Sequence, residues 1–474
     1  MLPMILYVLA FFHLLGIISA LNAVMTVRTS QGAIAWVISL LTFPYIAVPL
    51  YWLFGRSKFN GYTTARKEAE KLVSNKLHKI VTHLQSYRPA KESLGFLEKA
   101  SQKLAKMPYL HANDVELLID GEVTFQSILQ GIEKAKSYIL LEFYIVRDDT
   151  LGVQIQEALV TKAKEGVNIY FLYDEIGSYQ LSDEYIETMR RIGIEVYTFN
   201  TQKGIKNRFQ INFRNHRKIV VVDGESAWTG GHNIGDEYLS KSKRFGHWRD
   251  THIKITGPSA IAIQKTFIED WFWAAEYLIN ELQWIPRPAT NADKKVLIIP
   301  SSPADEIETA SLMFLQAINA AKERIWISSP YFVPDGAIIK ALQLAGLRGV
   351  DVRILIPQKA DNLLIYLASF TYFETVSSTG VKIFRYRDGF LHQKAMLLDD
   401  SHAAVSTANL DNRSLRLNFE ITALIANKEF TQEVKKMFED DFKHASEVKM
   451  ADIEKMPFAF KLITRLARLT SPIL

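Results

Sequence analysis

The chain has 474 residues, of which 48% are hydrophobic and 23% are charged, and it has no cysteine. This length allows two or three domains, each with its own core, and this composition excludes a disordered chain. The lack of cysteine excludes a disulfide framework and a thiolate metal site, and the net charge of +5 is small for the length.

Two uncharged segments open the chain, Leu2–Val27 and Thr29–Gly55. Each has the roughly 20 residues that an apolar helix needs to cross a membrane. The first lacks the basic start and short apolar stretch of a cleaved signal peptide. Pro44 interrupts the second, but proline is tolerated in membrane helices. The pattern predicts a transmembrane helical hairpin over residues 1–55, with helices at about 2–27 and 32–54.

A basic segment follows, with 12 Lys or Arg against 4 Asp or Glu from Arg56 to Lys106. The hairpin loop carries only Arg28. Because positive charge marks the cytoplasmic side of a membrane helix, we expect both termini and the rest of the chain in the cytoplasm. A basic segment there also attracts anionic headgroups, although a basic run can equally be a solvated surface. Residues 56–112 are therefore interpreted as a basic juxtamembrane linker.

The rest of the chain contains two copies of one pattern of apolar strands and amphipathic helices. This pattern predicts an α/β fold of two duplicated α/β/α domains with mixed sheets, at residues 113–280 and 295–447 with a linker at 281–294. The first copy has extra residues at 200–215, which we expect to form a loop at the mouth of the site. The matching segments are 131–145 with 317–332, 165–175 with 348–358, and 192–199 with 379–386.

The pattern H-x-K-x4-D occurs at His216–Asp223 and again, 176 residues later, at His392–Asp399. An asparagine follows each histidine by 17 residues, Asn233 in the first copy and Asn409 in the second. One copy would be a weak signal, but two copies with equal spacing indicate a duplicated half-site. A facing pair of histidines is what covalent phosphoryl chemistry without a metal needs. We expect neither a metal nor a cofactor.

Strand geometry divides the motif residues into two groups. Side chains two residues apart point to the same face of a strand, so the His and the Lys of each motif project together. The Asp follows its His by seven residues, an odd offset that points it to the opposite face. We therefore expect Asp223 and Asp399 to brace the motif from behind rather than to contact substrate.

A different carboxylate is then needed to hold each imidazole in one tautomer. Asp250 in HWRDTHIKI and Glu420 in LNFEITAL stand at matching places in the two copies, before a duplicated helix. These two residues are the candidates for orienting the histidines.

The expected chemistry is transfer at a phosphodiester. One His attacks phosphorus and forms a phosphohistidine, while the other donates a proton to the leaving alcohol and then takes one from the incoming alcohol. An imidazole pKa near ~6.5 would let both protonation states exist at neutral pH. Hydrogen-bond donors to the phosphate oxygens are expected from Lys218, Lys394, Asn233 and Asn409.

The C-terminal tail, residues 448–474, ends in FAFKLITRLARLTSPIL. Lys461, Arg465 and Arg468 recur at intervals of four and three residues and share one helical face. Two interpretations stay open: an interfacial membrane helix, or a surface helix packed on the second domain.

These residues resemble the phospholipase D superfamily, whose mark is the doubled H-x-K-x4-D. The apolar N-terminal segment and the sequences at 230–238, 248–258 and 407–414 are similar to bacterial cardiolipin synthases of that type. The resemblance implies a membrane-bound phosphatidyltransferase that joins two phosphatidylglycerol molecules into cardiolipin and releases glycerol. It also implies a multi-pass protein of the bacterial inner membrane.

The resemblance further implies which residues act. In this family the first histidine is usually the nucleophile, which favours His216 in that role and His392 as acid and base. A glycine commonly precedes the T-x-N of the second motif, and Ser406 at this place would crowd the second pocket slightly. The family's six active-site residues correspond to His216, Lys218, Asp223, His392, Lys394 and Asp399.

Two other functions compete with this one. The first is a membrane-bound phospholipase D-type hydrolase or nuclease that uses water as acceptor, and the second is an inactive membrane scaffold. The basic segment could bind nucleic acid, but the apolar helices before it favour a membrane. The expected partners are phosphatidylglycerol and other anionic phospholipids, and no nucleic acid. Phosphatidylethanolamine stays open as an alternative donor, and the oligomeric state stays undetermined.

Overall fold

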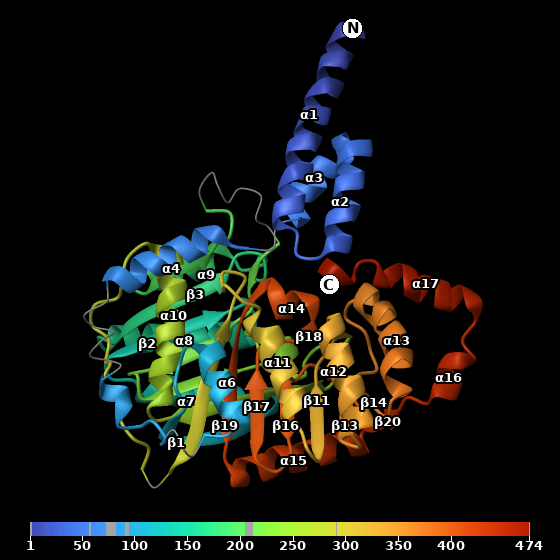
Figure 1. Cartoon of the computed structure of the whole chain (residues 1–474). Coiled ribbons are helices and arrows are strands. Elements are labelled where there is room, and N and C mark those ends of the chain that lie inside the picture. The colour runs from blue at the N-terminus through green and yellow to red at the C-terminus, as the bar shows by residue number, and fades with distance from the viewer. Residues whose placement is uncertain are drawn as a thin grey trace.

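The computed structural model describes residues 2–55, 58–72, 82–90, 94–203, 212–290 and 292–473. Its main feature is a 16-stranded mixed sheet in which two parts repeat one strand order. Figure 1 shows the sheet crossing the body of the protein with helices on both faces, and helices α1–α3 projecting from one end.

The first half contributes strands in the order β4-β3-β2-β6-β7-β9-β1. β2, β3 and β4 are parallel and the others are antiparallel. β2, with the sequence YILLEF, is buried at every position because helices cover both of its faces. The elements are β1 (Leu110–Ile119), α7 (Asp120–Lys134), β2 (Tyr138–Phe143), α8 (Thr150–Lys164), β3 (Asn168–Asp174), α9 (Asp183–Arg190), β4 (Glu195–Phe199), β6 (Ile219–Val222), β7 (Ser226–Gly230), the 3-10 helix η3 (Asp236–Leu239), β9 (Thr251–Thr256) and α10 (Ser259–Ala275).

The second half repeats this order as β14-β13-β11-β16-β17-β19-β10, with β20 added at the edge. The predicted duplication therefore extends to seven consecutive strands in each half of the sheet. The elements are β10 (Lys294–Ser301), α11 (Thr309–Ala320), β11 (Arg324–Ser328), β12 (Phe332–Val333), α12 (Gly336–Leu347), β13 (Asp351–Pro357), α13 (Leu363–Ser377), β14 (Lys382–Tyr386), β16 (Ala395–Leu398), β17 (His402–Ser406), β18 (Leu410–Asp411), α14 (Asn412–Arg416), β19 (Asn418–Ala426), α15 (Lys428–Lys443) and β20 (Ala445–Glu447).

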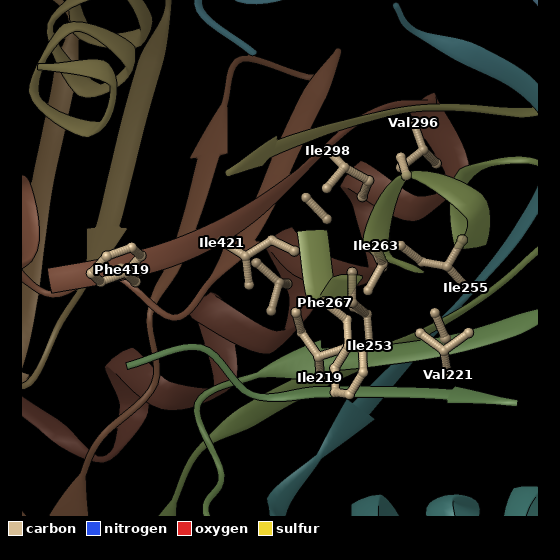
Figure 2. Close-up of a cluster of buried hydrophobic side chains, with 14 of the residues drawn as sticks. Ile219, Val221, Ile253, Ile255, Ile263, Phe267, Val296, Ile298, Phe419 and Ile421 are labelled. Atoms are coloured by element: carbon tan, nitrogen blue, oxygen red, sulfur yellow. The ribbon is translucent and has the colours of Figure 1, made fainter. Parts of the chain in front are cut away.

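The two halves join through antiparallel pairing of β1 with β10, which includes Leu110 opposite Val296. A hydrophobic core continues across this junction and contains α10 from the first half and α15 from the second. Each large apolar side chain buried there contributes about 1.5–3 kcal/mol, so the halves stabilise each other. Figure 2 shows Ile219, Ile253 and Phe267 of the first half close to Val296, Ile298 and Ile421 of the second.

The segment before β1 packs on this body rather than forming only a solvated linker. Phe59 and Tyr62, at the start of α4 (Asn60–Leu72), are buried in the shared core. Leu97 and Ala105 of α6 (Phe96–Ala105) are buried in the core of the second half. Part of the basic segment, residues 56–57, 73–81 and 91–93, lies outside the described residues, as do residues 204–211 of the expected mouth loop.

Helix α1 (Leu2–Thr26) is long and apolar enough to cross a membrane over residues Leu6–Thr26. Its large side chains, among them Phe11 and Ile18, are exposed to the surroundings instead of packing in the body. This is the burial pattern of a helix that faces lipid.

The second apolar segment does not form the expected second spanning helix. It breaks at Phe43, because the residue before a proline is disfavoured in the helical conformation and Pro44 has no N–H to donate. The resulting helices α2 (Ser30–Thr42) and α3 (Pro44–Phe54) have 13 and 11 residues. At ~1.5 Å per residue they are about 20 and 17 Å long, less than the ~30 Å apolar core of a bilayer.

The corner between α2 and α3 lies beside the middle of α1. A Cβ on Gly16 would be 2.4 Å from the carbonyl oxygen of Leu40, so the close approach requires glycine. α3 then returns towards the body, where the Tyr51 hydroxyl donates to Asn22 at 2.7 Å. The apolar region therefore has one helix long enough to cross a membrane, with a shorter helical hairpin beside it, where two long helices were expected. The N-terminus lies at the far end of α1 from the body (Figure 1).

The tail forms α16 (Met450–Glu454), α17 (Phe458–Arg468) and the 3-10 helix η4 (Ser471–Ile473). α17 packs along α13 of the second half, with the ring of Phe460 at 5.2 Å from that of Phe370.

Candidate active site

Two short parallel strand pairs, each with one strand from either half, position both histidines. β5 (Arg214–Asn215) runs parallel to the start of β19, and the next residue, His216, donates its backbone N–H to Phe419 at 2.9 Å. β15 (Phe390–Leu391) likewise runs parallel to β8 (Trp248–Arg249), and His392 N–H donates to Arg249 at 2.8 Å. The residue after each acceptor is the predicted orienting carboxylate. The register of two-residue strands thus sets histidine and carboxylate side by side.

Each imidazole contacts the carboxylate of the opposite half. His216 Nδ1 lies 2.9 Å from Glu420 Oε2, and His392 Nδ1 lies 2.7 Å from Asp250 Oδ2. A proton on Nδ1 satisfies these contacts and leaves the lone pair of each ring on Nε2. The site is therefore complete only when both halves are docked.

Both carboxylates are fully buried and charged. Burial raises the pKa of Asp250, but the charges of Lys394, His232 and His392 lower it by more. The net pKa therefore lies well below the usual range. Burial acts in the same direction on Glu420, where His216 and Lys218 bring the pKa below its ordinary value. Each carboxylate therefore remains an anion beside its histidine at neutral pH.

The motif lysines are buried on the same side as the histidines, as predicted from strand geometry. Lys218 Nζ donates to the backbone oxygen of His216 at 2.6 Å, and Lys394 Nζ lies 3.1 Å from Nε2 of His392. Burial lowers the pKa of Lys218 to about 7 and that of Lys394 to about 8, although the nearby carboxylates partly oppose this effect. Both lysines thus titrate near neutral pH.

Both histidines are neutral in the free site. Burial lowers the pKa of His216 to about 4, with Glu420 opposing and Lys218 adding to the effect. Burial and Lys394 lower the pKa of His392 to about 3. The expectation that an ordinary imidazole pKa supplies both protonation states at neutral pH is therefore wrong for the free site, because the surroundings are buried and cationic.

The two asparagines are placed differently from one another. Asn233 is used within the fold, accepting from the backbone N–H of Ile145 at 3.1 Å and donating to the Tyr238 hydroxyl at 3.1 Å. The buried Oδ1 of Asn409 has no hydrogen-bond partner among the described residues. Their role as phosphate donors stays a prediction, with Asn233 the more committed to structural contacts.

Asp223 and Asp399 stand at the far ends of β6 and β16 from the histidines. Asp223 accepts from the backbone N–H groups of Ser137 and Tyr138 at 2.8 and 2.9 Å, and Asp399 accepts from Glu323 and Arg324 at 2.9 and 3.0 Å. Both adopt left-handed φ angles, 53° and 50°. They fix the start of β2 and of β11, as the strand-parity argument predicts. Their place among the six active-site residues implied by the resemblance stays a prediction, and the contacts that the structure shows for both carboxylates are with backbone N–H groups.

The middle residue of each motif points away from the site, into a buried polar network. Arg217 donates to Asp270 at 2.5 Å, and Gln393 donates to Asp441 at 2.8 Å. The Tyr62 hydroxyl of α4 also donates to Asp270, at 2.6 Å. Asp270 and Asp441 occupy matching positions in the two copies of the sequence, and this match is the feature from which the network could have been predicted.

Two further carboxylates behind His216 were missed. Asp174 Oδ2 accepts from the backbone N–H of Asn215 at 2.8 Å, and Glu142 accepts from the Asn215 side chain. Burial raises the pKa of Asp174 to about 6, although backbone N–H groups including that of Gly177 oppose it. These contacts fix the residue that precedes the first histidine.

Ser406, expected to crowd the second pocket, fits within the sheet. Its hydroxyl lies 2.7 Å from that of Thr422 and accepts from Ala408 N–H at 2.9 Å. Within the described part of the chain, no three His, Cys, Asp or Glu side chains lie close enough to hold a metal ion. The expectation of chemistry without a cofactor stays a prediction.

Comparisons with known proteins agree with this geometry. A family model described as "Cardiolipin synthase, PLD-like domain" matches residues 128–271 and 314–442, more than half of the chain. The chain is 47% identical to cardiolipin synthase A of Pseudomonas fluorescens Pf-5 over 479 aligned positions, covering 99% of this chain and 98% of that protein. Cardiolipin synthase A of Pseudomonas putida F1 is also 47% identical, with the same coverage.

Among solved structures, phosphatidylserine synthase of Haemophilus influenzae superposes with a TM-score of 0.59 at 18% identity, covering 80% of this chain and 100% of that one. Such a distant likeness shows a shared fold. The doubled motif, the repeated sheet and the full-length match together lead to one conclusion: the chain belongs to the cardiolipin synthases of the phospholipase D superfamily.

Proposed function

We propose that this protein transfers a phosphatidyl group from one phosphatidylglycerol to another, giving cardiolipin and glycerol. The observation that carries the proposal is the crossed pair of histidine–carboxylate contacts, with two buried lysines beside them, in a body attached to an apolar helix. The full-length similarity to cardiolipin synthase A supports the choice of lipid substrates.

In the first step, Nε2 of His216 attacks the phosphorus of the donor lipid. A P–N bond forms, the bond from phosphorus to the headgroup oxygen breaks, and His392 gives a proton to the departing glycerol. Lysine cations beside the phosphate stabilise its non-bridging oxygens.

Substrate charge helps to protonate His392. With a pKa of about 3, the imidazole is protonated at neutral pH at a cost of about 5 kcal/mol. A phosphodiester anion ~4 Å away contributes about 4 kcal/mol at an effective dielectric constant of ~20. Bound substrate therefore brings the acid close to its working state, and an empty site keeps the nucleophile neutral.

In the second step, the primary hydroxyl of a second phosphatidylglycerol attacks the phosphohistidine. His392 takes the hydroxyl proton, the P–O bond to the acceptor forms, and the P–N bond to His216 breaks. Cardiolipin leaves and both histidines return to their starting forms.

The deciding experiment uses the purified full-length protein in phosphatidylglycerol bilayers, with products identified by mass spectrometry. We expect cardiolipin and glycerol in equal amounts. Phosphatidic acid as the main product would identify a hydrolase that uses water and would overturn the proposal. Phosphatidylethanolamine, alone and mixed with phosphatidylglycerol, tests which lipid serves as donor.

We further propose that the protein resides in the bacterial inner membrane with both halves on the cytoplasmic side. The excess of Lys and Arg from Arg56 to Lys106 supports this orientation. Because α2 and α3 are too short to cross, the N-terminus then lies on the opposite side of the membrane from Leu474. Reporter fusions at the two ends should report opposite sides, and the same side at both ends would restore a two-span hairpin.

A further inference from the structure

Helix α17 carries apolar side chains on two opposite faces. At 100° per residue, Phe460, Thr464 and Ala467 share the face that packs towards α13. The opposite face is exposed: Phe458 is 81% accessible, Leu462 48%, Leu466 55% and Leu469 76%. A helix on the surface of a water-soluble domain normally presents polar side chains there, so this exposed stripe needs a cover.

Three cations occupy one flank of α17, between its two apolar faces. Lys461, Arg465 and Arg468 line a groove of about 660 Å³ between α13 and the C-terminal helices. The guanidinium of Arg468 lies 5.2 Å above the ring of Tyr372, and the Lys461 ammonium donates to a backbone oxygen of α16. Glu374 also lines the groove, but no carboxylate among the described residues forms an ion pair with these cations. Their charge is thus available to an anionic partner.

The helix also lies at the end of the body that carries the membrane anchor. Arg28, at the base of α1, pairs with Glu308, and Arg416 of α14 contacts the same carboxylate at 3.4 Å. η4, which follows α17, contacts α14. Figure 1 shows α17 lying across this end of the body, crosswise to α1. A helix that lies in the plane of a membrane has this orientation beside a helix that crosses it.

We propose that α17 is a second membrane-docking element, which binds the surface of an anionic bilayer. Its exposed stripe enters the boundary between headgroups and acyl chains, while Lys461, Arg465 and Arg468 contact lipid phosphates. Docking at α1 and α17 together fixes the tilt of the body, which a single spanning helix leaves free to swing. The body then stays in one orientation at the surface of the bilayer whose lipids it uses.

The chain has no cysteine, so one introduced cysteine gives a unique labelling site. The test uses full-length Leu466→Cys protein, carrying an environment-sensitive fluorophore, in bilayers of phosphatidylglycerol and phosphatidylcholine. We expect quenching by nitroxides on the lipid acyl chains to be several-fold stronger than for Glu439→Cys, an exposed site on α15 at the opposite end of the body. Aqueous iodide should show the reverse order.

The charge requirement is tested in the same labelled protein with Lys461→Gln, Arg465→Gln and Arg468→Gln. All three side chains lie on the surface groove, so the fold is expected to persist. Lipid-borne quenching should fall several-fold in phosphatidylglycerol bilayers and should already be low in pure phosphatidylcholine. Quenching that responds to neither change would overturn the role of anionic lipid.

Two other outcomes would overturn the docking itself. The first is a label at position 466 that iodide quenches as strongly as one at position 439, which would mean an exposed helix. The second is protection from both quenchers, which would mean that a second copy of the chain covers the stripe. The readout needs no catalysis, so a protein that makes no cardiolipin can still confirm or refute this inference.

Discussion

The two halves of the active site hold their histidines by the same contact with different side chains. Glu420 contacts His216 and also accepts from the Thr407 hydroxyl at 2.6 Å. In the first half the place of Thr407 is taken by Gly231, where a Cβ would be only 1.9 Å from Asp250 Oδ1. The aspartate is one carbon shorter than the glutamate, so its carboxylate lies closer to the backbone and needs the space that glycine leaves. The hydrogen bond to the imidazole is the feature that both halves share.

The free nitrogens of the two rings also differ. Lys394 Nζ lies 2.9 Å from Nδ1 and 3.1 Å from Nε2 of His392, whereas Nε2 of His216 has no partner among the described residues. An uncommitted lone pair is available to attack phosphorus, and a ring beside an ammonium group is placed to exchange protons. This difference supports His216 as nucleophile and His392 as acid and base.

Replacing either histidine will have the largest effect, and the two losses will differ in kind. His216→Ala and His392→Ala should each lower turnover by about 10⁴-fold or more. His392→Ala should still form a covalent adduct from a donor with an acidic leaving group such as nitrophenol, because that group departs without a proton. Intact-protein mass spectrometry after acid quenching detects the adduct. An adduct on His392 in the His216→Ala protein would reverse the roles.

The two carboxylates that contact the histidines of the opposite half should have the next largest effect. Glu420→Gln and Asp250→Asn should each lower turnover by about 10³–10⁴-fold while the protein stays folded, because an amide can hold the wrong imidazole tautomer and cannot support an imidazolium. The matched control is Asp223→Asn, which should cost about 1–3 kcal/mol of stability through its backbone contacts and leave turnover of the folded protein near normal. Well-folded but inactive Asp223→Asn protein would refute the structural role given to that residue.

The lysines predict how activity depends on pH. With pKa values of about 7 and about 8, Lys218 and Lys394 lose their charge as the pH rises. Loss of the Lys218 charge should therefore steepen the fall of kcat/KM for phosphatidylglycerol by about tenfold per pH unit above about pH 7, and loss of the Lys394 charge by a further tenfold per unit above about pH 8. In Lys394→Arg protein the break near pH 8 should disappear while the break near pH 7 stays. A flat profile from pH 7 to 10 would contradict both shifts.

Stability should change in the opposite direction. Both lysines have a lower pKa in the folded protein than the ~10.4 of an unfolded chain, so between about pH 7 and 10 the unfolded chain binds more protons. The free energy of unfolding should rise with pH over this range while activity falls. Denaturant unfolding at several pH values separates the two effects.

Much of the fold and of the candidate site could be predicted from the sequence, because the duplication makes each local pattern appear twice. The spacing of His216 and His392, the matched strands and the parity of Asp223 all depend on local backbone geometry. That each carboxylate reaches the histidine of the other half could not be predicted, since it depends on how β1 pairs with β10. Nothing local in either copy encodes that contact.

In the N-terminal region, by contrast, local sequence patterns predicted features that the structure does not have. Hydropathy alone made Thr29–Gly55 look long enough to cross a membrane, but the break at Phe43 halves its reach. The excess of Lys and Arg in the segment after it indicates a solvated or lipid-facing surface. The charge pattern gave no indication that two aromatic residues of this segment, Phe59 and Tyr62, are buried in the core.

Tyr62 provides the smallest and most specific test of how the halves differ. Its hydroxyl donates to Asp270, which holds Arg217, and Arg217 in turn donates to the backbone oxygen of Glu420 at 3.1 Å. In the second half the corresponding Asp441 is held by Arg249, at 2.6 Å. Among the described residues, the segment that follows the anchor thus supplies a hydrogen bond to Asp270 of the first half but none to Asp441 of the second.

Tyr62→Phe should therefore cost about 1.5–3 kcal/mol of stability, the range for a hydrogen bond to a charged group. It should also slow adduct formation on His216 a few-fold, because Arg217 and the Glu420 backbone lose part of their support. The matched control is Tyr138→Phe, a buried tyrosine whose hydroxyl donates to Gln264 at 2.6 Å in the same core. That change should lower stability without slowing the adduct. Equal kinetics in the two variants would reduce Tyr62 to a packing residue and remove the link between the anchor segment and the nucleophile.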